Sequence, residues 1–173
     1  QHEIVKTKDD NEVKGRRHSR YNENLNLINI QFDENKQFDG IISYLRKQSN
    51  NNIDNLLVIT PSSCGDSSKS VKNIIEYEKP DLFFYAKNQP NQWISFDFKD
   101  HKVGLTHYTL QANIKGEYNI RNWKIEGSDD NNKWVVIDEH SNCNQMQGAS
   151  KVHTFQIKEA SQEFRYLRIF STG

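Results

Sequence analysis

The chain has 173 residues, which is enough for one domain with a sizeable core and an extension, but short for two domains. Lys and Arg together number 23, as do Asp and Glu, so the formal net charge is zero. A neutral chain lacks the basic excess that binds nucleic acid or an acidic membrane by charge, and we expect neither partner. The aromatic fraction of 11% exceeds what a disordered chain carries.

Residues 1–24 are dense in charge, and we interpret them as a linker or extension that precedes a domain at 25–173. Arg16, Arg17, His18 and Arg20 leave a second interpretation open, a small basic patch for an acidic partner or a phosphate.

The domain is expected to open with a strand at 25–32 and a short helix at 38–46 that Asp39 caps. We expect a buried strand at 56–60, a loop at 61–70 and one helical turn at 71–75. After this point polar turns separate strand-like segments at intervals of about ten residues. These strands are expected at 82–86, 93–98, 106–114, 121–127, 133–137, 152–157 and 164–170. The pattern predicts an all-β sandwich or barrel.

Cys64 and Cys143 are the two cysteines, and they lie far apart with no Cys-x-x-Cys spacing. A disulfide between them stays open, but we favour two unpaired thiols in a reducing compartment. The chain contains no Asn-x-Ser/Thr sequon, no apolar run as long as a membrane span and no signal-peptide pattern. We expect an intracellular protein, cytoplasmic or cytoskeletal, with an extracellular location as the alternative. Because the chain begins at Gln1, we expect it to be a fragment.

Four segments in the second half carry a resemblance to a known family. Residues 93–99 read WISFDFK, 106–110 read THYTL, 123–134 read WKIEGSDDNNKW and 165–169 read RYLRI. Together they resemble a discoidin domain, also called coagulation factor V/VIII type C, over residues 38–173. The resemblance implies a galactose-binding-like β-sandwich or jelly roll with one or two short helices. Residues 40–45 and 106–108 are similar to the intracellular branch, which occurs beside BTB, BACK or ubiquitin-ligase domains in protists and animals.

Large aromatic side chains at alternating positions fill the space between two sheets. We therefore assign five of them to the core: Trp93, Phe96, Phe98, Trp123 and Trp134. Residues 127–132 are expected to form a hairpin turn, because their short polar side chains bond nearby backbone groups. Arg165 and Arg168 are expected to pair with Asp97 or Glu126 on neighbouring strands.

The chain departs from the family in two places. Discoidin domains continue through a loop to one last strand, whereas this chain ends at Gly173. Either that strand is missing, or another segment such as 25–32 supplies the edge. Many sugar-binding members also have an Asp-Gly calcium loop, and the corresponding residues 75–81 lack the glycine. We expect no metal and no cofactor, with Glu76, Glu78 and Asp81 as the calcium candidates.

No catalytic pattern is present. The six His show no zinc-binding spacing, and the Ser residues at 62–68 lack a Gly-x-Ser-x-Gly elbow. Asp129 and Asp130 fall in an expected exposed turn, where no burial would shift a pKa. The chain is therefore predicted not to be an enzyme.

The resemblance implies that ligands bind to loops at one end of the sandwich, which here are 61–70, 87–92 and 115–118. Membrane-binding relatives carry Trp, Phe or Leu at the tips of these loops. The three loops here contain none of these residues, so we expect no insertion into a membrane. Their candidate ligand-binding residues are Ser63, Asp66, Lys69, Asn88, Asn91 and Tyr118.

The predicted function is a non-catalytic protein-interaction or scaffold module within a larger protein or assembly, because binding a protein needs no special chemistry. The alternative is a carbohydrate-binding module of a secreted or cell-surface protein. A purely architectural role without a free ligand is a third possibility.

Overall fold

The computed structural model describes residues 3–8, 26–50, 52–79 and 81–173, with side chains from Leu27 onward. Within these ranges the chain forms ten strands, one α-helix and two short 3₁₀ helices. In chain order they are β1 (Glu3–Lys8), β2 (Asn26–Gln31), α1 (Ile41–Gln48), η1 (Ile53–Asn55), β3 (Val58–Pro61), η2 (Val71–Ile75), β4 (Trp93–Asp97), β5 (His101–Gly104), β6 (His107–Gln111), β7 (Trp123–Ser128), β8 (Val135–His140), β9 (Val152–Gln156) and β10 (Tyr166–Ser171). None of the helices in the described part is both long and apolar enough to cross a membrane.

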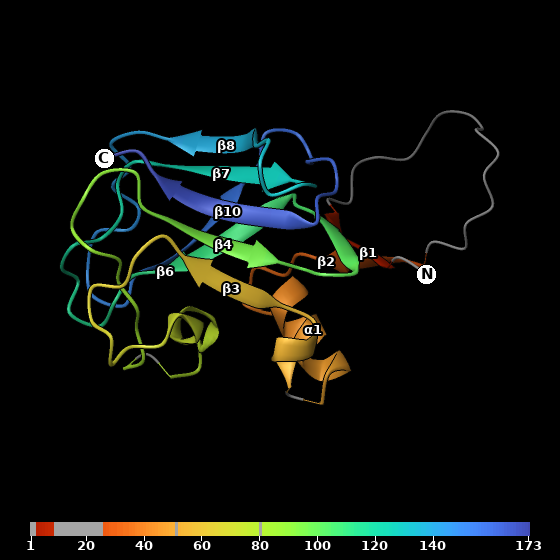
Figure 1. Cartoon of the computed structure of the whole chain (residues 1–173), viewed down its shortest axis with the longest axis horizontal. Coiled ribbons are helices and arrows are strands. Elements are labelled where there is room, and N and C mark those ends of the chain that lie inside the picture. Colours follow the sequence, from red (N-terminus) through yellow and green to blue (C-terminus); the bar gives the residue numbers. More distant parts are fainter. Residues whose placement is uncertain (1–2, 9–25, 51, 80) are drawn as a thin grey trace.

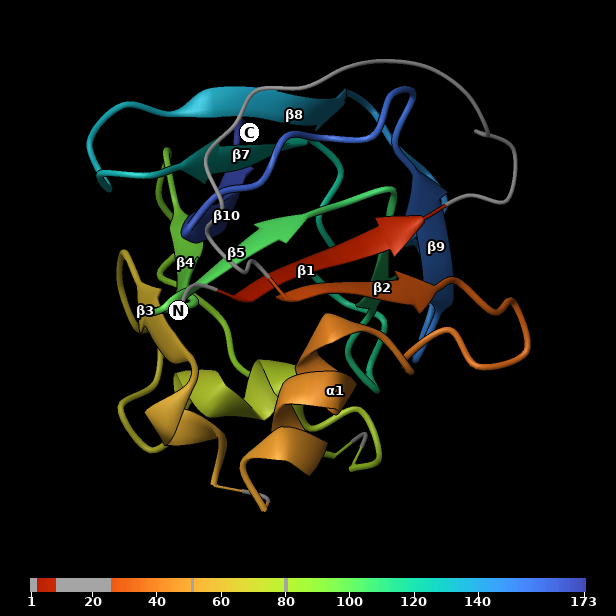
Figure 2. The same cartoon turned by 90° about the vertical axis from the view of Figure 1, so that its right-hand side faces the viewer.

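The strands form two layers. An antiparallel sheet in the order β3-β4-β10-β7-β8 makes the front layer in Figure 1. The parallel sheet β2-β1-β5 and the antiparallel pair β6-β9 lie behind it, and Figure 2 shows them from the side with α1 beneath. The expected galactose-binding-like β-sandwich is confirmed.

One part of the core lies beside α1. Ile41 and Leu45 are buried on one face of the helix and pack with Phe98, Val103 and Phe164. Their spacing of four residues puts both side chains on the same helix face. The helix therefore closes one end of the space between the layers.

The other part of the core surrounds Trp123, whose side chain is fully buried. Its ring stacks on His140 at 4.7 Å between centroids and meets the edge of Phe155 at 5.2 Å. The indole Nε1 donates to the Tyr108 hydroxyl at 3.0 Å, and that hydroxyl donates to Asp138 Oδ2 at 2.8 Å. Burial and this bond to a carboxylate both raise the pKa of Tyr108. One ring thus joins β7 and β8 of the front layer to β6 and β9 behind them.

The N-terminal residues contain a strand that we did not expect. Glu3–Lys8 form β1, which pairs in parallel with both β2 and β5, whereas residues 1–24 were interpreted as a linker. The basic run at 16–20 lies outside the described residues. Strand β2 lies at the edge of this sheet, which is the position left open for segment 25–32.

Several expected elements differ in the structure. Residues 82–86 are not a strand, because their backbone groups bond to loops: Phe83 O accepts from Asn73 Nδ2 and Tyr85 O accepts from Gly65 N. The helix begins at Ile41 with Gly40 as its N-cap, while Asp39 accepts a bond from the Ser43 hydroxyl.

The strand boundaries also shift. Strand β3 lies at a sheet edge with Val58 exposed, so it is not the buried strand that we expected at 56–60. The expected strand 106–114 is shorter, and β5 precedes it as a strand that the sequence did not indicate.

The assignment of aromatic residues to the core was wrong for two of the five. Trp123 and Phe98 are buried, and Phe96 packs against the core from a partly exposed position. Phe96 on β4 packs against the core, and Trp93 lies on the opposite face of that strand, so it points out of the sandwich. Trp134, directly before β8, also points outward, where it stacks on Arg168. Alternation separates two faces of a strand but does not tell which face is inward.

The predicted turn and ion pairs are confirmed. Residues 129–134 connect β7 to β8, two residues later than the expected turn at 127–132, and Asp130 Oδ1 accepts from the backbone N–H of Asn132 and Lys133. Arg165 binds both oxygens of Asp97, at 2.9 and 3.0 Å. Burial raises the pKa of Asp97, but the bonds from Arg165 and from the Lys99 N–H outweigh it and hold that pKa below its usual value.

Gly127 offers a test of the packing between the layers. A Cβ at this position would overlap the Phe164 ring, so Gly127→Ala should lower the free energy of unfolding by about 1–3 kcal/mol. Urea denaturation measures the loss. In a Phe164→Leu background, where the ring is absent, the same substitution should cost less than half as much. An equal cost in both backgrounds would contradict the close approach.

Candidate functional site

Several loops lie together at one end of the sandwich, on the left in Figure 1. They consist of residues 62–70, 85–92, 112–122, 141–151 and 171–173, which we call the loop end. Backbone bonds join its parts: Ser171 N donates to Gln92 O at 2.7 Å and Thr172 N to Asn122 O at 3.1 Å. The three loops predicted to carry a ligand all belong to the loop end.

Gln92 holds the first two loops together. Its Oε1 accepts a bond from the Ser62 hydroxyl at 3.0 Å and another from the Ser63 hydroxyl. Ser63 Oγ in turn accepts the Lys87 N–H at 3.0 Å. The structure therefore brings the 61–70 and 87–92 loops side by side, but it uses Ser63 to join them.

The other predicted residues of these two loops differ in how many contacts their side chains make within the protein. Asp66 Oδ1 accepts both the N–H and the hydroxyl of Ser68, and these bonds lower the pKa of Asp66. The ammonium of Lys69 lies 4.9 Å from the centroid of the Phe83 ring. Asn88 and Asn91 are exposed, and Asn91 has a positive φ of 60° that asparagine tolerates well. The amides of Asn88 and Asn91 are therefore the groups best placed for a ligand.

Tyr118 stands alone on the third loop with its side chain 98% exposed. No hydrogen bond or ring contact joins it to the predicted residues on the other two loops, all of which the structure describes. Asn113 orders the loop, because its Oδ1 accepts the N–H groups of Lys115 and Gly116 at 2.8 Å each. Gly116 has φ 72° and its Cα faces the backbone of residue 149, so only glycine fits there. A tightly bonded loop thus presents a free tyrosine ring to solvent.

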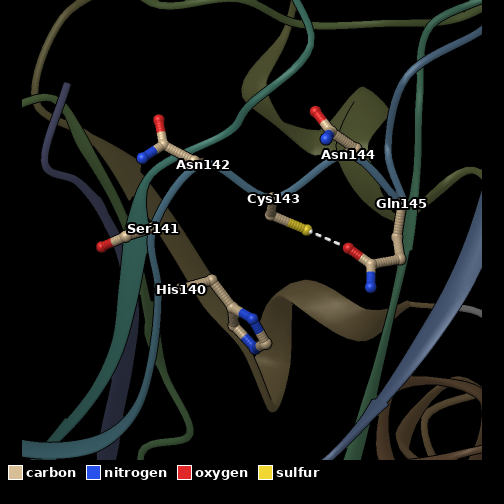
Figure 3. A pocket seen from close by; sticks show the side chains of 6 residues that line it. All are labelled: His140, Ser141, Asn142, Cys143, Asn144 and Gln145. Carbon is tan, nitrogen blue, oxygen red and sulfur yellow. Dashed lines mark hydrogen bonds between the residues drawn. The ribbon is translucent and has the colours of Figure 1, made fainter.

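An open depression lies in the loop that follows β8, and it was not among the predicted sites (Figure 3). It has a volume of about 610 Å³ and is lined by His140, Ser141, Asn142, Cys143, Asn144 and Gln145. The Cys143 thiol donates to Gln145 Oε1 at 2.8 Å, and these two side chains point toward each other. Asn142 and Asn144 point away from them, on the other side of the chain. The lining offers hydroxyl and amide groups, which the density of Ser, Asn and Gln at 141–147 could have indicated.

The calcium candidates do not gather into a site. Glu76 binds Arg46 at 2.9 Å and lies 3.7 Å from Lys79, whereas Glu78 and Asp81 are exposed. Across the described residues, no group of three or more His, Cys, Asp or Glu side chains is placed to hold a metal ion.

Comparison with known proteins identifies the family. The model of the F5/8 type C domain matches residues 58–173, which is more than half of the chain. The chain belongs to the F5/8 type C domain family. The discoidin resemblance is confirmed at this level, while the intracellular branch stays a prediction.

Solved structures share the fold of this F5/8 type C domain at low identity. The module CpGH89CBM32-5 from Clostridium perfringens, solved with GalNAc-β-1,3-galactose, has a TM-score of 0.55 and 15% identity, over 68% of this chain and 84% of that one. The CBM32 module of AlyQ, solved with 4,5-unsaturated mannuronic acid, gives 0.52 and 19%, over 68% and 83%. The C-terminal domain of a chitobiase from Bacteroides fragilis gives 0.51 and 18%, over 67% and 80%. A search of curated proteins finds no match. Domains of this family are binding modules, which agrees with the prediction of a non-enzyme.

The reactivity of the two cysteine thiols in this F5/8 type C domain can be used to test how the loop end is packed. Both are unpaired, as we favoured; Cys64 is partly exposed and Cys143 is 6% exposed. A thiol reagent such as DTNB should modify Cys64 in the folded protein, and Cys143 at least tenfold more slowly, because burial blocks access. The variants Cys64→Ser and Cys143→Ser assign the two rates. Equal rates below the unfolding transition would contradict the packing of the 141–151 loop.

Proposed function

We propose that this domain binds carbohydrate through its loop end, without catalysis. The observation that carries the proposal is Tyr118, whose ring is 98% exposed on a loop held by its own hydrogen bonds. Exposed aromatic rings pack against the C–H faces of sugar rings, and nearby amides and hydroxyls bond the sugar hydroxyls. The loop end supplies such groups at Asn88, Asn91 and Asn142.

The likeness in fold to modules solved with sugars supports this proposal. It makes the alternative function predicted from the sequence the leading one, ahead of a protein-interaction or scaffold role. The two unpaired thiols are in keeping with a reducing compartment, and the intracellular location stays a prediction.

Substitution of Tyr118 tests the proposal. Tyr118→Ala should weaken binding to glycans at least tenfold, because it removes the exposed ring, while Tyr118→Phe should keep most of the affinity. A glycan array followed by isothermal titration calorimetry measures the effect. Both variants should unfold at the wild-type temperature, since Tyr118 contributes no core packing. Glycan binding that is unchanged in Tyr118→Ala would refute the assignment to the loop end.

A protein-interaction role has one observation in its favour. Strand β8 lies at a sheet edge, and Val135 and Val136 on it are each 48% exposed. An exposed edge strand can pair with a strand of another protein.

Affinity capture with matched variants tests this second function. Val136→Lys should reduce capture of a protein partner, because a charge on the edge disfavours strand pairing, while Tyr118→Ala should leave it unchanged. Quantitative mass spectrometry of the captured proteins measures the difference. Equal capture by wild type and Val136→Lys would exclude the β8 edge.

A further inference from the structure

The front sheet carries a second surface that the loop end does not include. Phe96 on β4 and Leu167 on β10 pack in the core, so the side chains that alternate with them along these strands point away from it. Strand register aligns them in three rows: Trp93, Phe170, Lys124 and Glu139; then Thr60, Ser95, Arg168, Glu126 and Val136; then Val58, Asp97, Tyr166 and Ser128. Together with Trp134 we call these residues the outer face. No other described segment crosses the middle of these strands in Figure 1.

Arg168 organises the centre of the outer face. Its guanidinium carbon lies 4.0 Å from the centroid of the Trp134 ring and 5.1 Å from that of Phe170. Its Nε donates to Glu126 Oε2 at 2.5 Å. Stacking on two rings and a charge-assisted bond fix this side chain, so the rings beside it are ordered as well.

Three polar residues of the outer face are buried although they lie outside the core. Ser95 is 7% exposed, Glu126 9% and Ser128 1%. Ser128 is enclosed by the turn that follows β7, where its hydroxyl bonds Asp130. No other described segment crosses the middle of the sheet in Figure 1, so the larger side chains of the same face cover Ser95 and Glu126. The aromatic and arginine side chains therefore form a preformed platform, and a ligand would lose little binding energy in ordering it.

The outer face has no net charge once Arg165 is counted with it; this residue directly precedes β10, and its guanidinium carbon lies 4.8 Å from the centroid of the Tyr166 ring. Arg165 pairs with Asp97 at 2.9 Å, Arg168 with Glu126 at 2.5 Å and Lys124 with Glu139 at 3.5 Å. Each cation of the rows thus has an anion on a neighbouring strand. An acidic polymer or nucleic acid would find no unpaired positive charge here, whereas an uncharged ligand loses nothing by the pairing.

The size of the outer face also limits its occupant. Five strands spaced about 4.8 Å apart and three rows about 6.6 Å apart cover a few hundred Å². A standard protein interface needs about 800 Å² from each partner. The face is too small for a stable protein dimer but matches a short run of sugar rings. The row that contains Trp93 adjoins the loop end, because the Trp93 N–H donates to Ser62 Oγ.

We propose that the outer face is a second carbohydrate site, which binds an uncharged oligosaccharide chain against Trp93, Phe170 and Tyr166. The ligand class rests on the proposed function, but the site and its residues are independent of the loop end. Sugar rings would lie on the partly exposed aromatic rings, and Thr60 and Lys124 at the rim would bond their hydroxyls.

The three tryptophans allow a direct test by NMR of their indole N–H signals. Trp93 and Trp134 belong to the outer face, whereas Trp123 is fully buried and bonds Tyr108, so it serves as the internal control. Trp93→Phe and Trp134→Phe assign the signals in the full chain. The probes are cellohexaose, laminarihexaose and N-acetylchitohexaose, with hexagalacturonate as the acidic comparison.

At least one uncharged hexasaccharide should shift the Trp93 and Trp134 signals and leave Trp123 in place, and hexagalacturonate should bind at least tenfold more weakly. Trp93→Ala should lower the affinity of that hexasaccharide about tenfold, while Trp93→Tyr retains a ring and most of the affinity. If the face signals stay unmoved with every probe at 10 mM, or if hexagalacturonate binds best, the proposal is overturned.

Tyr118→Ala separates this site from the loop end. The shifts at Trp93 and Trp134 should persist in this variant, even where it abolishes glycan binding at the loop end. Their loss in Tyr118→Ala would mean that the outer face is no separate site. If a glycan binds to the outer face and Tyr118→Ala changes no glycan binding at all, the site on the outer face is supported and the proposed site at the loop end is refuted.

Discussion

The fold depends on the burial of one indole ring, that of Trp123, between the two layers. This ring contacts His140 and Phe155 and donates to Tyr108, so it holds β7 and β8 against β6 and β9. Burying such a large ring supplies several kcal/mol, which no surface contact of this domain can match. The two proposed binding surfaces depend on strands that this packing fixes in place.

The residues directly before and after Trp123 in the chain contribute to the loop end and to the outer face, respectively. Asn122, directly before it, ties the C-terminal residues to the loop end, because its backbone oxygen accepts the Thr172 N–H. Its side-chain oxygen accepts the Asn142 N–H at 2.8 Å, which anchors the loop after β8. Lys124, directly after it, points to the opposite side and joins the outer face. Within three successive positions, the inward residue thus packs in the core and its two neighbours support the proposed binding surfaces.

Much of this fold could be predicted from the sequence, because alternation at 93–98 and 123–128 has the period of a half-buried strand. The errors have physical causes. Residues 82–86 have the apolar run of a strand, yet Gly65 and Asn73 take up their carbonyl groups instead of a neighbouring strand. The parallel pairing of β1 with β5 joins residues about a hundred positions apart, and no local pattern encodes such a contact.

The candidate site was harder to predict, because a loop sequence does not tell which polar side chains the loop itself consumes. Ser63 and Asp66 have the right chemistry for a ligand, but they bond Gln92 and Ser68 in the folded chain. A short polar side chain reaches nearby groups of its own loop and bonds them, whereas an aromatic ring has no short polar group for such local bonds. Tyr118, with φ 55°, carries such a ring. The loops of this domain thus contain short polar residues that hold the loops together and a few larger groups, such as Tyr118, that stay exposed.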